Sequence, residues 1–365
     1  MVRRTRTKQQ SHNAPVSQSA AFKYSTSLNA LLDGPKRDKH RILIADATVA
    51  FWTDKPTIVE DIFAQFASEG SGALDADAVQ DEGLRKKIES FLLALREGKE
   101  AYSDVAKEPD RTLFHLLAIS PNAARLSIRF YFQGAVTHLL ENLRRHYEDI
   151  RISPQLAKGK RKGDPEYPPT WLLLRQTARE SKDIPPILSG PLLRAIVAGT
   201  KYPPGLFSSV MRRINADRTV NYARCCVIKG HLVRNLGQEV PMSLDKERED
   251  RAYRLGRLFA ALDKTQTDGI GKVNVTVRDR FYSSASATPQ SVFPRLLRTY
   301  QHHLSKLEGG LKVDREKLVQ EILSPIEDFP AHLSLSEQGR FALGYYHQTQ
   351  HFYTKKQQTS EERTN

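Results

Sequence analysis

The hydrophobic pattern changes period about midway along the chain. In the first half, residues 41–53 are rich in β-branched and aromatic side chains, and residues 126–132 alternate apolar with polar. This alternation predicts strands. We expect one or two strands over 41–53, a strand pair over 113–132 with its turn at 120–122, and a helix over 134–147. Apolar residues at helical spacing predict one more helix over 84–95.

In the second half, apolar positions recur every three or four residues, which predicts helices. We expect helix starts near Trp171, Pro191, Pro204, Val220, Arg251, Ser291, Asp314 and Ser336. Asp314 and Ser336 are expected N-caps, and Gly309-Gly310 is expected to separate two helices. Ser291 is expected to cap its helix, which would place Pro294 in the first turn, where proline is tolerated.

The two patterns meet at residues 155–169, QLAKGKRKGDPEYPP, a basic stretch with Gly and Pro and no apolar period. This composition is typical of a linker. The prediction is an α+β region over 1–154, a basic Pro/Gly linker over 155–169 and an all-α helical bundle over 170–365. The fold class is therefore mainly α overall. A chain of 365 residues can build about two such cores.

Charge is unevenly distributed, although the chain as a whole is strongly basic at +14. Residues 151–235 contain 16 Lys and Arg against 5 Asp and Glu, a net charge of +11. Residues 41–110 contain 8 against 15, a net charge of −7, and residues 242–365 contain 19 against 16, a net charge of +3. A basic middle is the pattern expected of a protein that binds a polyanion.

One stretch, residues 274–300, combines basic, aromatic and small hydroxylated side chains. Cations that suit phosphate stand beside rings that suit base stacking. A solvated basic helix face fits the same pattern equally well. The candidate nucleic-acid contacts are Arg278, Arg280, Phe281, Tyr282, Arg295 and Arg298.

The basic middle supplies a second set of candidates on two consecutive predicted helices. These are Arg212, Arg213, Arg218, Arg224, Lys229 and Arg234. Arg213 and Arg224 can instead pair with Asp217, and we expect roughly a third of these charges to be structural. On the predicted strand over 126–132, Arg129 and Tyr131 share one face, which either contacts RNA or is a solvated edge.

No catalytic constellation emerges from the titratable residues. Cys225 and Cys226 are adjacent and alone, which supports neither a disulfide framework nor a metal site. His347 and His351 have helical i, i+4 spacing but lack the carboxylate and third ligand of a zinc site. We expect a protein that is not an enzyme, with no metal and no cofactor. A cytoplasmic location with no membrane association follows from the lack of a long apolar run or a secretory signal.

Several long blocks of the chain resemble one protein family. They include NAPVSQSAAFKYSTSLNALL, ADATVAFW, SPNAARLSIRFYF, YRLGRLFAALDK, RDRFYSSASATPQSVFPRLLR and FPAHLSLSEQGRFALGYYHQ, together with the long run from PPILSGPLLRAIVAGTKYPPG to CCVIKGHLVRN. In this order they resemble the large subunit of the type I-C CRISPR interference complex, the RNA-guided assembly called Cascade. The resemblance covers residues 13–356, and nothing in residues 1–12 resembles the family. A long N-terminal portion of the family is expected to be absent.

The resemblance implies a non-catalytic subunit in antiviral defence. Such a subunit would contact guide RNA (crRNA) and target DNA, assemble with the backbone and guide-processing subunits, and help to recruit a separate Cas helicase-nuclease. Guide pairing reads the sequence, while the protein grips the backbone and stabilises the R-loop by holding the displaced strand. Reading of the motif beside the target is credited largely to the family's N-terminal portion, so we do not expect it here.

Two other functions remain open. A CRISPR-associated nuclease would share the basic surface and would cut single-stranded DNA with magnesium or manganese. A generic basic nucleic-acid-binding regulator would footprint a duplex sequence and would not associate with the complex.

The resemblance also implies a second product, because type I-C systems make their small subunit by internal translation from the large-subunit gene. Met242 lies between two predicted helices, and residues 242–365 comprise 124 residues, enough for a small bundle. The codons of Gln238, Glu239 and Val240 can spell AGGAGGT, a bacterial ribosome-binding sequence. We therefore expect residues 242–365 to be made as a separate small subunit from a start at Met242.

Overall fold

Strands occur only early in the described chain, and helices dominate the rest. The structure, a computed structural model, describes residues 16–35, 37–44, 47–67, 112–122, 125–155, 163–271 and 273–361. The early elements are α1 (Gln18–Asp33), α2 (Arg37–His40), β1 (Arg41–Ile44), β2 (Ala47–Thr53), α3 (Ile58–Ala67), β3 (Leu113–Asn122), β4 (Arg125–Ala135) and α6 (Val136–Ile150). The expected helix over 84–95 lies outside the described residues.

The later elements form the helical part. They are α7 (Thr170–Arg175), a 3-10 turn (Ser181–Asp183), α8 (Pro186–Val197), α9 (Pro204–Asp217), α10 (Tyr222–Gly230), a π-helical turn (His231–Asn235), α11 (Arg251–Ile270), α12 (Val277–Ala287), α13 (Pro289–Leu304), α14 (Gly309–Leu323) and α15 (Leu335–Glu361). The sheet and these helices confirm the predicted fold class of an α+β region followed by a helical bundle.

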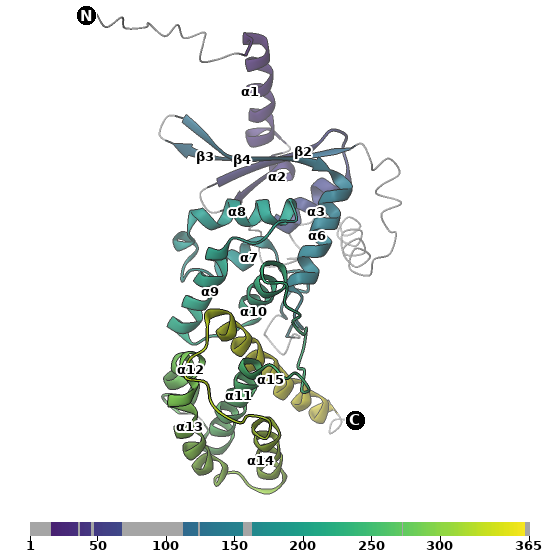
Figure 1. Cartoon of the computed structure of the whole chain (residues 1–365). Helices are drawn as coiled ribbons and strands as arrows, with labels where there is room; N and C mark the ends of the chain where they lie inside the picture. The colour runs from purple at the N-terminus through teal and green to yellow at the C-terminus, as the bar shows by residue number, and fades with distance from the viewer. Residues whose placement is uncertain are drawn as a thin grey trace, which may run out of the picture.

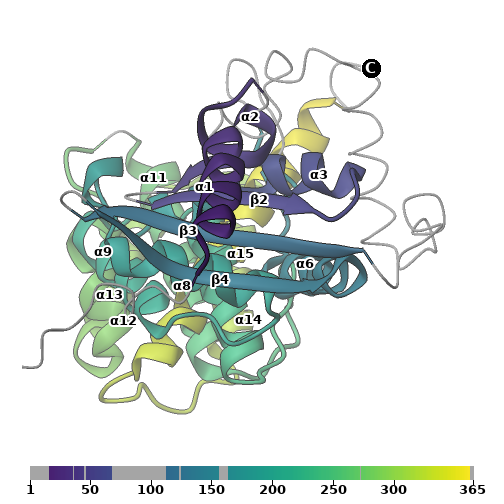
Figure 2. The ribbon, with the colours of Figure 1, turned by 90° about the horizontal axis from the view of Figure 1, so that it is seen from above.

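The sheet is antiparallel, with strand order β1-β2-β3-β4. Alternate residues such as Phe51, Phe114 and Phe130 point inward, where α3, α6 and α8 cover the sheet, while α1 stands on the opposite face (Figures 1 and 2). Of the one or two strands expected over 41–53, two are present, and the pair predicted over 113–132 is confirmed. The expected turn at 120–122 is wrong, because these residues belong to β3 and pair with β4.

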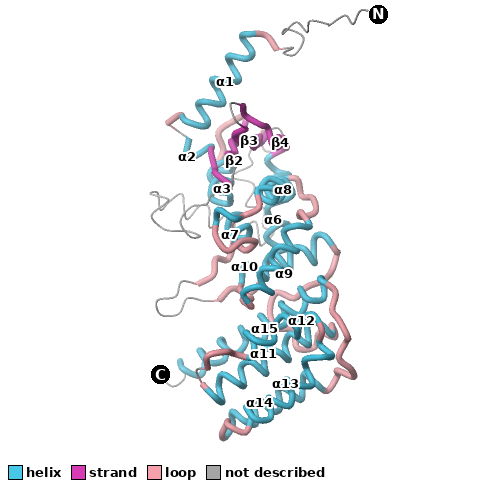
Figure 3. Tube along the Cα trace, turned by 90° about the vertical axis from the view of Figure 1, so that its left-hand side faces the viewer, coloured by secondary structure: helices cyan, strands magenta, loops and turns pink. Residues whose placement is uncertain are grey.

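The helical part is built around α11 and α15, which cross at close range (Figure 3). Glycines at the crossing make this possible, because a Cβ on Gly256 would lie 2.0 Å from the Phe341 carbonyl oxygen. A Cβ on Gly344 would lie 2.0 Å from the Tyr253 carbonyl oxygen. Helices α12, α13 and α14 pack around α11 at the end of the molecule away from the sheet.

Most predicted helices are present, but several expected caps are wrong. Pro191 lies inside α8, which begins at Pro186. Thr288 precedes α13, so Pro294 falls beyond the first turn and Ser291 is not its cap. Helix α14 begins at Gly309, so the two glycines start that helix and Asp314 lies inside it.

Two further helices differ from the prediction. Helix α15 begins at Leu335, and the Ser334 hydroxyl exchanges hydrogen bonds with Glu337, so Ser334 rather than Ser336 caps it. Helix α12 was not expected, because residues 277–287 are rich in Ser and Ala and lack a strong apolar stripe. Its helical geometry determines which of the candidate side chains reach solvent.

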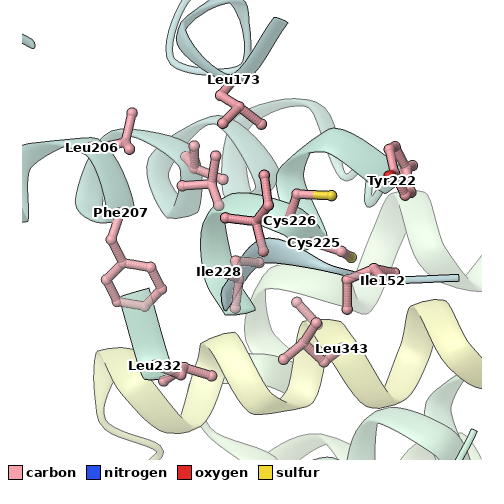
Figure 4. Packing of buried hydrophobic residues seen from close by; sticks show 14 of the residues in the cluster. Ile152, Leu173, Leu206, Phe207, Tyr222, Cys225, Cys226, Ile228, Leu232 and Leu343 are labelled. Atoms are coloured by element: carbon pink, nitrogen blue, oxygen red, sulfur yellow. The ribbon is translucent and has the colours of Figure 1, made fainter. Parts of the chain in front are cut away.

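One hydrophobic core runs across the predicted linker. Ile152 precedes the linker, Leu173 follows it and Leu343 lies on α15, yet all three belong to one buried cluster around α10 (Figure 4). Helix α6 likewise packs against α8 and α10. The domain boundary at 155–169 stays a prediction, and packing crosses it. No helix in the described ranges is long and apolar enough to span a membrane.

Candidate nucleic-acid interface

Helix α12 is held at its N-terminus by a capping box. The Thr276 hydroxyl accepts a hydrogen bond from the backbone N–H of Asp279 at 3.1 Å, and the Asp279 carboxylate accepts from the backbone of Thr276 at 3.0 Å. These Thr276 hydrogen bonds hold the pKa of Asp279 below its usual value. The acidic residue between the two candidate arginines therefore serves to start the helix.

A half-buried carboxylate on α11 holds the first turn of α12. Asp263 accepts hydrogen bonds from the backbone N–H of Arg278 at 3.1 Å and from the Tyr345 hydroxyl at 3.1 Å. Burial raises the pKa of Asp263, because the charged form loses its hydration. This contact joins α11, α12 and α15 at the first turn of α12.

Helix α12 also contacts two neighbouring helices, α9 and α13. The Ser283 hydroxyl donates to the Asn215 carbonyl oxygen on α9 at 3.0 Å. On the α13 side, the Arg295 guanidinium lies 5.3 Å from the centre of the Phe281 ring, a cation–π contact. The tertiary fold thus brings residues from both predicted candidate sets to one region.

The exposed members of this region form what we call the α9–α13 basic cluster: Arg218, Arg278, Arg280, Arg295 and Arg298. Arg280, Arg295 and Arg298 are exposed, and Arg218 and Arg278 are partly exposed. Arg218 ends α9 with a left-handed backbone, φ 53°, which turns the chain at this point. It lies near enough to Asp279 to lower the pKa of that carboxylate, which places it beside α12. Phe281, half-buried beneath Arg295, is the ring of this cluster.

Tyr282 requires a correction. It is only 1% exposed and packs edge-on against Phe259, Phe341 and Tyr345 at 5.6 to 5.7 Å between ring centres. One residue further along a helix turns a side chain by about 100°, so Phe281 and Tyr282 face different surroundings. Tyr282 is a core residue and is unavailable for base stacking.

Three of the six basic candidates in the middle of the chain are also buried. Arg224 is 5% exposed and binds Asp217 through two nitrogens at 2.6 and 2.7 Å. Lys229 is 7% exposed and donates to the Arg151 carbonyl oxygen at 2.5 Å. Arg234, also 7% exposed, donates to Asp149 at 2.5 Å and lies over the Tyr202 ring.

A buried charge is stable only with a fixed polar partner, and each of these three side chains has such a partner inside the protein. We therefore exclude Arg224, Lys229 and Arg234 from the interface. The predicted pairing of Asp217 with Arg213 and Arg224 is confirmed, with Arg213 at 2.8 Å. Burial acts in the opposite direction, yet the hydrogen bonds from Arg224 and Thr219 hold the pKa of Asp217 below its usual value. Arg212 remains exposed on α9 and donates to Ser209.

Within the described ranges, no group of three or more His, Cys, Asp or Glu residues could hold a metal ion. His347 is buried on α15, and its Nδ1 lies 2.9 Å from the Tyr253 hydroxyl. Burial lowers the pKa of His347 to about 3, which keeps the ring neutral near pH 7. Of the two histidines with i, i+4 spacing, His347 and His351, the first is therefore a packed core residue.

One aromatic row on the sheet was missed from the sequence. Trp52 stacks on His115, with ring centres 5.1 Å apart and planes within 8°, and His115 in turn stacks on Tyr131. The sequence alternation placed Tyr131 on a strand face. It could not reveal the strand register that sets the other two rings beside it.

The fold and this surface define a mainly helical protein with a small antiparallel sheet at one end and an exposed basic cluster near the other. The model of the CRISPR-associated protein family Cas_Csd1 matches residues 4–353, so the chain belongs to this family. The match includes residues 4–12, which were expected to lie outside the resemblance. No curated protein matches the chain.

Proposed function

We propose that this chain is a non-catalytic subunit of a type I-C Cascade complex that binds nucleic-acid backbone. The observation that carries the proposal is the α9–α13 basic cluster in a protein of a CRISPR-associated family. Three exposed arginines beside a half-buried ring suit the phosphates and bases of an unpaired strand. The guide would read the sequence, and this surface would hold the displaced strand of the R-loop without reading it.

Co-expression with the other complex subunits and a guide array tests the assembly. A tag on this chain should recover the backbone and guide-processing subunits together with guide RNA and, after target addition, target DNA. Recovery of the chain without guide RNA and subunits would contradict the proposal. Recruitment of the Cas helicase-nuclease belongs to the same assembly and is tested by adding it to the recovered complex.

We further propose that residues 242–365 are also made as a separate helical small subunit that carries most of the basic cluster. Met242 lies in the loop before α11 and is 39% exposed. Most contacts that fasten this loop to the bundle lie after Met242, including Arg257 to the Lys246 carbonyl oxygen at 2.9 Å and Arg340 to Asp250 at 2.6 Å. A chain starting at Met242 would keep both.

The same start would uncover one apolar face. Leu343 on α15 is 1% exposed and lies in the cluster around α10, which would be absent from the short product (Figure 4). Its uncovered face would need another partner within the complex. The proposed small subunit is therefore expected to be most stable when assembled.

A C-terminally tagged gene should yield two bands. Silent recoding of Gln238 and Glu239 should remove only the shorter band, as should Met242→Leu, which changes an exposed side chain without disturbing the core. A single band from the unaltered gene would contradict internal initiation at Met242. A short band that persists after both changes would do the same.

A further inference from the structure

We infer that the outer face of the sheet carries a second contact for a single strand, in which one unpaired base stacks on Tyr131. The inference rests on the proposed nucleic-acid binding but uses none of the residues of the α9–α13 basic cluster. It starts from three rings on three neighbouring strands: Trp52 on β2, His115 on β3 and Tyr131 on β4. Trp52 and His115 are direct partners in the strand register.

The stack ends at the open edge of the sheet. His115 and Tyr131 have ring centres 6.2 Å apart with planes 26° from parallel. Strand β4 is the edge strand, so no strand of the described sheet continues the row beyond Tyr131. Tyr131 is 50% exposed, whereas the His115 side chain beside it is only 12% exposed. A flat partner can therefore extend the row at Tyr131.

Hydrogen bonds hold this exposed ring in place. His115 Nε2 lies 2.8 Å from the Asp54 carboxylate, and His115 Nδ1 lies 2.7 Å from the Tyr131 hydroxyl. A carboxylate only accepts, so Nε2 donates to Asp54, and the Tyr131 hydroxyl is held between His115 Nδ1 and the Gln133 amide oxygen, to which it donates at 3.4 Å. Ordering an exposed side chain costs conformational entropy, and a ring already held loses less on binding.

The neighbours of Tyr131 along β4 suit a nucleotide better than an apolar protein surface. Side chains two apart on a regular strand share a face about 7 Å apart, so Gln133 lies beside Tyr131 on β4. Arg129, also exposed, lies at the register irregularity between β3 and β4, where its Nε donates to the Ser120 hydroxyl at 2.6 Å. An arginine suits phosphate, and an amide can bond a base edge. Ile128 is the more exposed apolar residue of this strand, and the register irregularity between β3 and β4 separates it from Tyr131.

The affinity test uses the full chain and short oligo(dT) and oligo(rU) probes. Tyr131→Ala should weaken binding of the preferred probe about 5- to 150-fold, the equivalent of the about 1 to 3 kcal/mol that one stacked base contributes. The slope of log affinity against log salt should not change, because no phosphate contact is lost. Ile128→Ala, which changes a more exposed side chain on the same strand, should leave the affinity unchanged.

A photocrosslink locates the contact directly. Probes carrying 5-iodouracil should crosslink to Tyr131, identified by mass spectrometry of the β4 peptide. Crosslinks confined to Phe281 and its neighbours would overturn this inference while supporting the proposed function. The absence of any crosslink or binding would contradict both. Loss of a copurifying protein subunit from Tyr131→Ala, with unchanged probe affinity, would overturn the inference in favour of a protein contact.

Discussion

At the scale of single residues, burial divides candidates that look alike in sequence. Arg224 and Arg280 carry the same charge, but Arg224 is held in the core by Asp217 whereas Arg280 faces solvent. Phe281 and Tyr282 are neighbours in sequence, and only Phe281 remains accessible. The residue type shows that an arginine can bind phosphate and that a ring can stack on a base. The position of the residue on its helix decides whether the side chain reaches solvent to do so.

Tyr282 provides a direct test of this division. Its hydroxyl is buried without a hydrogen-bond partner in the structure, so Tyr282→Phe should change the free energy of unfolding by less than about 1 kcal/mol. Tyr282→Ala should cost about 3 to 5 kcal/mol, because it leaves a cavity among three rings. Denaturant unfolding measures both. A large loss from Tyr282→Phe would mean that the hydroxyl has a partner.

His347 should make stability depend on pH. Its pKa is lowered to about 3 in the folded chain by burial, while the unfolded chain has an ordinary value near 6.5. As pH falls below about 6.5 the unfolded state gains a proton that the folded state does not, so stability decreases.

Between pH 6 and pH 5, the free energy of unfolding of the unaltered chain should fall by about 1 kcal/mol more than that of His347→Gln. The matched control is His332→Gln, which changes an exposed histidine in the loop before α15, and the decrease attributed to His347 should persist in this variant. Equal pH profiles for the His347 variant and the unaltered chain would contradict the buried neutral ring.

At the scale of elements, the α11–α15 crossing organises the helical part. The sequence predicts the two helices but not where they cross. The positions of their glycines do not show which backbone lies opposite. Element types were largely predictable because the apolar period changes clearly between strands and helices. Helix α12 was missed for a physical reason: it buries Val277, Tyr282, Ala285 and Ser286, and the last two side chains are too small to produce an apolar stripe.

Substitutions at the crossing should therefore be costly. Gly256→Ala or Gly344→Ala would drive a methyl group into a carbonyl oxygen of the facing helix, and we expect a loss of about 3 kcal/mol or more. Gly310→Ala is the control, because nothing lies within 4 Å of its Cβ position. That change should be neutral or stabilise by up to about 1 kcal/mol. Similar unfolding midpoints for all three variants would contradict the close crossing.

At the scale of the whole molecule, the candidate surface is assembled from segments far apart in the chain. The end of α9 meets the consecutive helices α12 and α13 through tertiary contacts such as Ser283 with Asn215. Both basic stretches are visible in the sequence, as is the pairing of Asp217 with Arg213 and Arg224, but residue order does not show that the two stretches adjoin or that Lys229 and Arg234 are buried. Side-chain burial and ion pairing depend on the packed fold, which residue order alone does not specify.

The central claim is that the α9–α13 basic cluster binds nucleic-acid phosphates. The most direct measurement is the salt dependence of single-strand affinity for a chain in which Arg280, Arg295 and Arg298 are changed to Gln. A control changes Arg194, Lys201 and Lys312, three exposed basic residues outside the cluster, to Gln. Circular dichroism verifies that both variants are folded.

If the three arginines contact phosphates, the slope of log affinity against log salt should become shallower by about 2, at about 0.7 for each lost contact. The control variant should keep the slope of the unaltered chain. An unchanged slope in the folded Arg280, Arg295 and Arg298 variant would mean that the cluster is a solvated surface, and the account of this protein as a backbone-binding subunit would be contradicted.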